Sequence, residues 1–169
     1  MIPMALLGVR VEANNQPIVL LREEGGSRYL PIFIGIPEAT AIGFALQGEQ
    51  PPRPMTHDLF ATVMDEAGLR LEQVEITELH DGTFFAEITL RRGTETLRIS
   101  SRPSDAIALA VRMSHDVPIL AAAAVLDEAG VVYETEAGTD DEADETLGAP
   151  DIEEFREFLD QVRPEDFAD

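Results

Sequence analysis

In three short runs near the start of the chain, apolar residues occupy every second position, and this spacing constrains the fold more than any other feature. The runs lie at 7–11, 18–20 and 30–34, and turn residues separate them at 14–17 and 25–27. Alternation of this kind predicts half-buried β-strands, because successive side chains of a strand point to opposite faces. The first part of the chain therefore predicts three antiparallel strands.

A second set of strands follows, and its apolar residues predict the pairing register. With residues 80–82 as a three-residue loop, Ile76 faces Ala86, and apolar residues share one face of the sheet. A two-residue turn at 81–82 would instead pair Ile76 with Glu87, so we reject it.

The third strand of this set and the helices complete the predicted fold. A two-residue turn at 92–93 places Ile88 opposite Leu97. Proline or a cap residue opens each apolar helical segment, and glycine closes two of them. The predicted elements are helices at 37–47, 56–67 (with Thr56 as the cap) and 103–113, a strand at 117–120 and an Ala-rich helix ending before Gly130. Together they predict an α+β fold: two three-stranded antiparallel meanders with helices packed on them, plus a C-terminal amphipathic helix.

The 169 residues divide into one domain and an acidic appendage. We expect a domain at 1–130, an acidic linker at 131–149 and an acidic tail helix at 150–169. The tail helix has an apolar stripe of Ile152, Phe155, Leu159 and Val162. It either docks on the core or contacts a partner protein.

The formal net charge is -21, and all 12 basic residues are arginine. A surface this acidic repels polyanions, so the charge disfavours passive binding of nucleic acid. A metal-assisted reaction on a phosphate is not excluded, because metal sites are themselves acidic.

Three absences narrow the class of protein. The chain has no cysteine, which excludes disulfides and Cys-based zinc sites and predicts a cytoplasmic location. No apolar run approaches the roughly 20 residues of a membrane span, so we expect no membrane partner. The first residues, MIPMALLGVR, lack the pattern of a signal peptide.

The stretch PPRPMTHDLF, residues 51–60, gathers Arg53, His57 and Asp58. Neighbouring residues of a helix point about 100° apart, so His57 and Asp58 do not pair with each other. Asp58 either stabilises the helix start or takes part in a site, and His57 lies where it can border a cleft. Arg53 either forms a salt bridge or holds an anion. The apolar face of this helix comprises Leu59, Phe60, Val63, Met64 and Ala67.

A second stretch, SSRPSDAIALAVR at 100–112, predicts a helix that is apolar almost all round and therefore buried. Asp105 lies in its first turn, where a buried carboxylate needs backbone donors, Arg102 or a metal ion as its partner. It is either a capping acid or one of two carboxylates, with Glu38, that share a divalent ion such as Mg²⁺ or Mn²⁺.

Together with HDGTFFAEI (80–88), three stretches resemble the bifunctional nuclease domain family: LPIFIGIPEATAIGFAL (30–46), PPRPMTHDLF (51–60) and RPSDAIALAVR (102–112). The resemblance covers about residues 4–130. It implies an α+β domain, a homodimer and a nuclease activity on RNA and DNA. The residues that match the family motifs are Glu38, Arg53, Thr56, His57, Asp58, Arg102, Ser104 and Asp105. This chain has Ser100-Ser101 where family members often place an acid, which weakens a metal site there.

The residues and the resemblance are therefore compatible with two functions. In the first, a metal-assisted nuclease, Asp105 with Glu38 or Asp58 holds the ion, Arg53 or Arg102 steadies the phosphate and His57 moves a proton. In the second, a non-enzymatic regulatory or assembly module, the same motifs are buried helix starts and a dimer surface.

Overall fold

The computed structural model describes residues 1–11, 15–49 and 51–132. Within these residues the chain is α+β, as predicted. The strands are β1 (Ile2–Val11), β2 (Pro17–Glu23), β3 (Arg28–Phe33), β4 (Arg70–His80), β5 (Thr83–Arg92), β6 (Glu95–Ser101), β7 (Ile119–Ala121) and β8 (Val131–Val132). The helices are α1 (Ile36–Gln47), α2 (Thr56–Glu66), α3 (Pro103–Ala110) and α4 (Ala123–Ala129).

The strands form one mixed sheet, whereas the sequence predicted two three-stranded antiparallel meanders and did not predict that the strand at 117–120 joins them. Its eight strands follow the order β6-β5-β4-β7-β1-β2-β3-β8. Strands β1–β3 and β4–β6 each pair antiparallel with their neighbours in sequence. β7 joins the two sets, since it pairs antiparallel with β1 and parallel with β4. The short β7 therefore makes one sheet out of two local ones.

The predicted pairing of Ile76 with Ala86 is confirmed, but the loop is not the one expected. His80 pairs with Thr83, which leaves a two-residue turn whose residues have φ of 48° and 74°, a turn of the primed type. A register shift between Ile76 and Glu78 restores the apolar pairing that this turn alone would lose. The two-residue turn at 81–82 that we rejected from the sequence is therefore present. The β-bulge that makes it compatible with the Ile76–Ala86 pairing was not predicted.

The predicted register of the next hairpin is wrong by two residues. Arg92 pairs with Glu95, and Ile88 pairs with Ile99 instead of Leu97. A shift of two keeps every side chain on its face, because side chains alternate with a period of two. Apolar alternation thus fixed the face but not the pairing.

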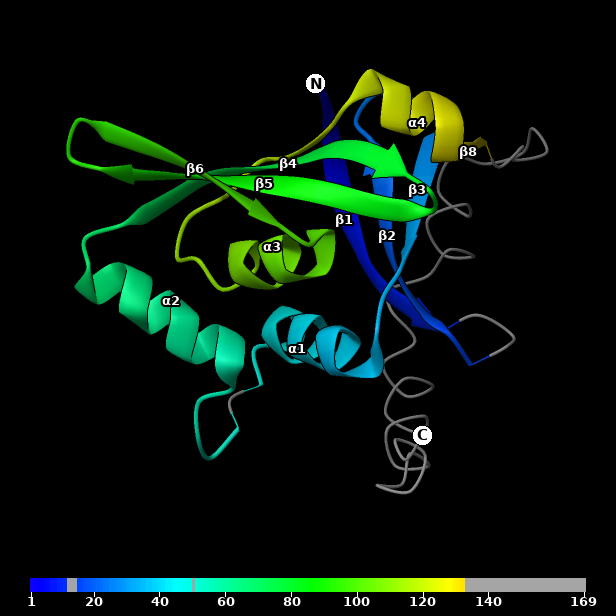
Figure 1. Cartoon of the computed structure of the whole chain (residues 1–169). Coiled ribbons are helices and arrows are strands. Elements are labelled where there is room, and N and C mark those ends of the chain that lie inside the picture. Colours follow the sequence, from blue (N-terminus) through cyan, green and yellow to red (C-terminus); the bar gives the residue numbers. More distant parts are fainter. Residues whose placement is uncertain (12–14, 50, 133–169) are drawn as a thin grey trace.

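Helices α1 and α3 pack side by side against the sheet, and α2 packs on α3 (Figure 1). α3 is the most buried of the helices, and Ala106, Ile107 and Ala108 are fully inaccessible to solvent, as the sequence predicted. It ends at Ala110, earlier than the predicted residue 113. Because α3 lies between α1 and α2, side chains from all three helices meet around it.

Only part of the apolar face assigned to α2 from the sequence packs on the core. Leu59, Phe60 and Val63 are 58%, 49% and 55% exposed, and Met64 is the buried residue of this helix. His57 and Asp58 carry the polar contacts from α2 to α3 that are described below. Met55 takes the cap position predicted for Thr56, and the Asp58 carboxylate accepts a hydrogen bond from the Met55 amide at 2.7 Å.

Two further predictions concern the end of the domain and the segment that follows it. The family-like domain was expected to end at residue 130, and β8 extends the sheet to Val132 by pairing with β3. The acidic linker beyond this strand and the tail helix at 150–169 lie outside the described residues. Among the described helices, none has the length and hydropathy needed to cross a membrane.

Candidate active site

The start of α3 presents a carboxylate at the surface. Arg102 caps the helix, Pro103 opens it and Asp105 lies in the first turn. The Arg102 guanidinium donates two hydrogen bonds to this carboxylate, from Nε to Oδ2 at 2.8 Å and from Nη2 to Oδ1 at 3.1 Å. Such a two-point contact fixes the orientation of both groups.

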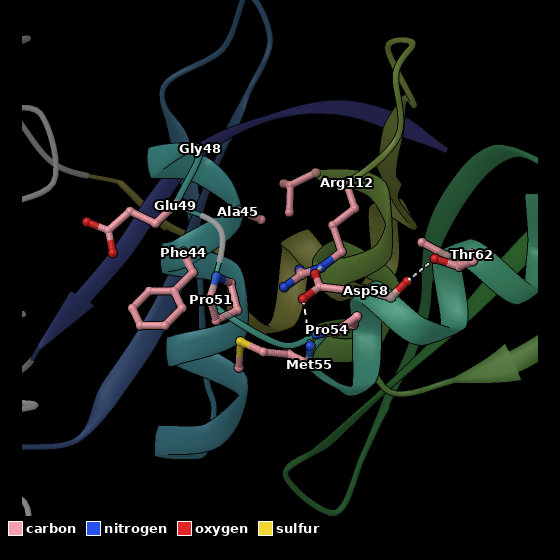
Figure 2. A pocket seen from close by; sticks show the side chains of 12 residues that line it. Phe44, Ala45, Gly48, Glu49, Pro51, Pro54, Met55, Asp58, Thr62 and Arg112 are labelled. Carbon is pink, nitrogen blue, oxygen red and sulfur yellow. Dashed lines mark hydrogen bonds and ion pairs between the residues drawn. The ribbon is translucent and has the colours of Figure 1, made fainter.

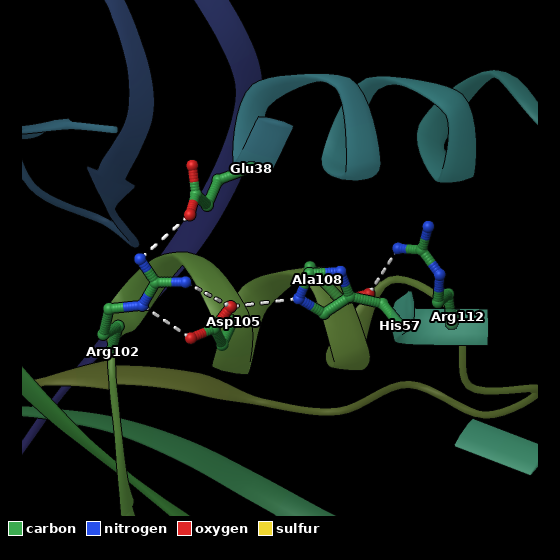
Figure 3. Close-up of polar contacts among 6 residues, drawn as sticks. All are labelled: Glu38, His57, Arg102, Asp105, Ala108 and Arg112. Carbon is green, nitrogen blue, oxygen red and sulfur yellow. Dashed lines mark hydrogen bonds and ion pairs between the residues drawn. The ribbon is translucent and has the colours of Figure 1, made fainter. Parts of the chain in front are cut away.

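Arg102 also connects α3 to α1. Its Nη1 lies 2.9 Å from Oε1 of Glu38, an acid in the first turn of α1. The side chain of Glu38 is 15% exposed and that of Arg102 is 65% exposed. The two predicted metal-binding carboxylates, Glu38 and Asp105, are therefore gathered by the fold, with a guanidinium between them (Figure 3).

His57 joins this group from α2. Its Nε2 lies 3.0 Å from Oδ1 of Asp105, although the two residues are 48 positions apart in the sequence. The His57 side chain is 16% exposed. We call Glu38, His57, Arg102 and Asp105 the Arg102 cluster; Figure 3 shows them as a chain of contacts along α3.

The protonation state of this cluster follows from Asp105. Burial opposes its charged form, but hydrogen bonds from Arg102 and His57 outweigh burial, so the pKa of Asp105 lies below its usual value. Asp105 is then ionised at neutral pH and can only accept hydrogen bonds. His57 therefore carries a proton on Nε2, which leaves Nδ1 as the ring nitrogen that can exchange a proton.

Asp58 belongs to a different group. Arg112 Nε donates to its Oδ1 at 2.6 Å, and Arg112 Nη1 donates to the carbonyl of Ala108 at 2.7 Å. Burial opposes ionisation of Asp58, yet the contacts of Arg112 and the Met55 amide keep its pKa below the usual value. This Asp58–Arg112 pair ties α2 to α3 and does not contact Glu38 or Asp105.

The remaining predicted residue, Arg53, is exposed and forms no ion pair with the described residues. Arg112, by contrast, was not predicted as a site residue. Its side chain is only 8% exposed. An arginine at the end of an almost wholly apolar helix must find a carboxylate, and this signal in the stretch 100–112 could have identified the pair.

The Arg102 cluster does not fit a divalent ion as it is arranged. Within the described residues, no group of three or more His, Cys, Asp and Glu side chains is placed to hold a metal ion. The carboxylates of Glu38 and Asp105 both contact the Arg102 guanidinium, which supplies the positive charge that an ion would bring. Binding of an ion by this pair would require Arg102 to leave.

The fold and the cluster define an α+β domain in which three helices bring a histidine, two acids and an arginine together at the surface. The model of the bifunctional nuclease domain matches residues 19–134. The chain therefore belongs to the bifunctional nuclease domain family, as the motifs indicated.

Individual relatives extend this comparison. An uncharacterized protein of Mycobacterium tuberculosis is 45% identical over 163 residues, which cover 96% of this chain and 95% of that protein. Bifunctional nuclease 1 of Oryza sativa subsp. indica is 29% identical over 117 residues, 68% of this chain and 35% of the plant protein. Bifunctional nuclease 2 of Oryza sativa subsp. japonica is 30% identical over 112 residues, 64% of this chain and 34% of its own. The chain thus matches about a third of each plant protein.

Proposed function

We propose that this protein hydrolyses phosphodiester bonds of RNA and DNA at the Arg102 cluster. The observation that carries the proposal is the 3.0 Å contact between His57 and Asp105. An ionised carboxylate that accepts from Nε2 fixes the tautomer and the orientation of the ring, which leaves Nδ1 as the atom that would take a proton from the attacking water. Family membership and the names of the plant relatives support the same reaction.

The arginines supply the positive charge that a phosphate needs on so acidic a protein. Arg102 is 65% exposed although it contacts both acids, so its guanidinium can also reach a bound phosphate. Arg53, exposed beside α2, is the second such group. Asp58 contributes indirectly in this scheme, because its pair with Arg112 holds the helix that carries His57.

The requirement for Mg²⁺ or Mn²⁺ is a separate part of the proposal. Asp105 and Glu38 would be the ligands, and Arg102 would have to give up its contacts with them, so we assign no chemical step to the ion. We also propose a homodimer and a cytoplasmic location for the working protein.

The test is cleavage of labelled RNA and DNA by the pure protein with magnesium, manganese or a chelator. We expect His57→Ala to lower the rate by roughly 10²–10⁴-fold, the usual contribution of a general base. His80→Ala is the matched control, because His80 lies at a hairpin end with 76% of its side chain exposed. Cleavage that His57→Ala and Asp105→Asn leave unchanged would come from a contaminant and would reject the site.

A second candidate function is an assembly or regulatory module without catalysis. The observation that favours it is the exposed apolar face of α2, with Leu59, Phe60 and Val63. Because a homodimer is proposed for both functions, the cleavage assay separates them: a dimer in sedimentation analysis that cleaves neither RNA nor DNA supports the module.

A further inference from the structure

A pocket of about 430 Å³ is lined by Asp58, the residue that follows His57 of the Arg102 cluster in the sequence. Its walls come from the end of α1, residues 51–55 and α2, and Val111 and Arg112 close it behind α3. The volume is within the range of about 300–1,000 Å³ that is typical of small-molecule sites. We call it the α1–α2 pocket. Neither of the proposed functions uses it.

The two sides of this pocket differ in chemistry. Figure 2 shows Phe44, Pro51 and Met55 on one side and the Asp58–Arg112 pair opposite them. The apolar side offers a ring and two flat or flexible surfaces against which a planar group can pack. The polar side offers a fixed pair of charges with defined directions.

Arg112 has a hydrogen-bond donor to spare. Its side chain is 8% exposed, Nε donates to Asp58 and Nη1 donates to the Ala108 carbonyl. Nη2 forms no hydrogen bond with any described residue. Among the described residues, Nη2 is not one of the fully buried side-chain atoms that lack a partner, so it is open to solvent, and an acceptor on a ligand in the pocket would bond it in place of solvent.

The charge of the pocket excludes a bare phosphate as its occupant. The lining has two acids, Glu49 and Asp58, against one base, Arg112. A neutral planar heterocycle with acceptor atoms on its edge suits both sides: its faces pack on Phe44 and its edge accepts from Arg112.

The residues next to the pocket favour one kind of heterocycle, the base of a nucleotide. Asp58 of the pocket is adjacent to His57 of the cluster, with Cα atoms about 3.8 Å apart. Arg53 lies in the segment that forms one wall, and it is exposed and unpaired with described residues. Arg53 and His57 lie in the sequence between residues that line the pocket, so a phosphate attached to the heterocycle and held outside the acidic pocket would have these two groups in the neighbouring segment.

We propose that the α1–α2 pocket binds the base of one nucleotide of the substrate, while the attached phosphate lies outside it toward His57 and Arg53. This inference rests on the proposed nuclease function, which it deepens by giving the enzyme a base-binding subsite. The enzyme would then prefer, at the cleavage site, bases whose edge accepts a hydrogen bond from Arg112.

The test measures binding, so that it does not depend on catalysis. Adenosine, cytidine and ribose 5-phosphate are titrated into the full chain, and binding is followed by NMR. We expect both nucleosides to bind saturably and to show cross-relaxation with the Phe44 ring and the Met55 methyl group. Nucleoside binding that leaves these side chains untouched, or no binding of either nucleoside, overturns the inference.

A variant that fills the pocket supplies the second readout. Ala45 lines the pocket from α1. Ala45→Leu should weaken nucleoside binding at least tenfold, while any binding of ribose 5-phosphate, which has no base to enter the pocket, should keep its affinity. Gln47→Leu places the same side chain on the same helix outside the lining and is the matched control. Equal nucleoside affinity in both variants overturns the subsite. Should Ala45→Leu fail to fold, the NMR contacts of the unaltered chain decide.

The two proposals fail in distinguishable ways. Nucleoside binding at Phe44 without any cleavage of RNA or DNA rejects the nuclease and leaves a nucleoside-binding pocket. Cleavage of oligonucleotides with the same kcat/KM in Ala45→Leu and the unaltered protein rejects the subsite and leaves the nuclease.

Discussion

The two halves of the Asp58–Arg112 ion pair should differ in their importance for stability. Arg112 is 8% exposed, whereas Asp58 is 32% exposed and can be hydrated when its partner is removed. Asp58→Ala leaves a nearly buried guanidinium without its carboxylate and also removes the acceptor for the Met55 amide. Arg112→Met leaves a carboxylate that water reaches. We expect Asp58→Ala to destabilise the fold more than Arg112→Met.

The magnitudes follow from burial. Breaking a buried pair from one side costs about 3–5 kcal/mol, and the bond that Arg112 keeps to Ala108 places Asp58→Ala near the lower end, at about 3 kcal/mol. Arg112→Met should cost about 1–2 kcal/mol, as for a group that regains water. For a chain of this length each kcal/mol lowers the melting temperature by about 2–4 °C, so Asp58→Ala should lower it by roughly 6–12 °C.

Urea unfolding of the two single variants and the double variant measures these terms as a double-mutant cycle. The control is Glu95→Ala, which breaks a pair with Arg92 whose side chains are 56% and 52% exposed, and which should cost at most about 0.5 kcal/mol. The double variant should be less destabilised than the sum of the single variants. A cost for Asp58→Ala equal to that of the control, or strict additivity, would refute the reasoning from burial.

Two further predictions concern pH and backbone geometry. The pKa of Asp105 is depressed in the folded state, so its stabilisation is present above the unfolded value of about 3.9 and is lost as the pH falls through the folded value. The difference in unfolding free energy between the unaltered protein and Asp105→Asn should therefore be constant above about pH 5 and shrink toward pH 2; a difference that stays constant in acid contradicts the assignment. Gly48 ends α1 with φ of 67° and has open space where a Cβ would lie, so Gly48→Ala should cost about 1 kcal/mol by conformation alone, and Gly48→Asn less, in thermal melts. Equal costs for Ala and Asn would show that the left-handed conformation is not the cause.

Local patterns in the sequence predicted most of the elements, and the errors arose where a distant part of the chain decides. The Ile76–Ala86 pairing was predictable because apolar alternation demands it, but the bulge that permits it was not. The joining of two sets of strands by β7 depends on three residues, too few to show a periodicity. On α2, Met64 is buried as expected but Leu59, Phe60 and Val63 are exposed, because an exposed apolar residue and a packed one give the same sequence pattern.

For the candidate site, the sequence indicated the residues but not the contacts between them. Acids at two helix starts left open whether Asp105 is a capping acid or shares a site with Glu38, and in the structure both acids contact Arg102. The sequence could not show that Arg102 stands between them, because the choice between a guanidinium and a metal ion depends on distances. His57 was placed at a border from helix geometry alone, and its contact with Asp105 required the packing of α2 on α3.

The position of β7 also bears on how the chain is assembled in the cell. In the described sheet, β1 and β4 are joined through Ile119–Ala121, so a nascent chain cannot complete the sheet until this tripeptide has emerged from the ribosome. Before β7 is synthesised, the edges of β1 and β4 that it covers have unpaired backbone hydrogen-bonding groups. These edges can then associate with other chains.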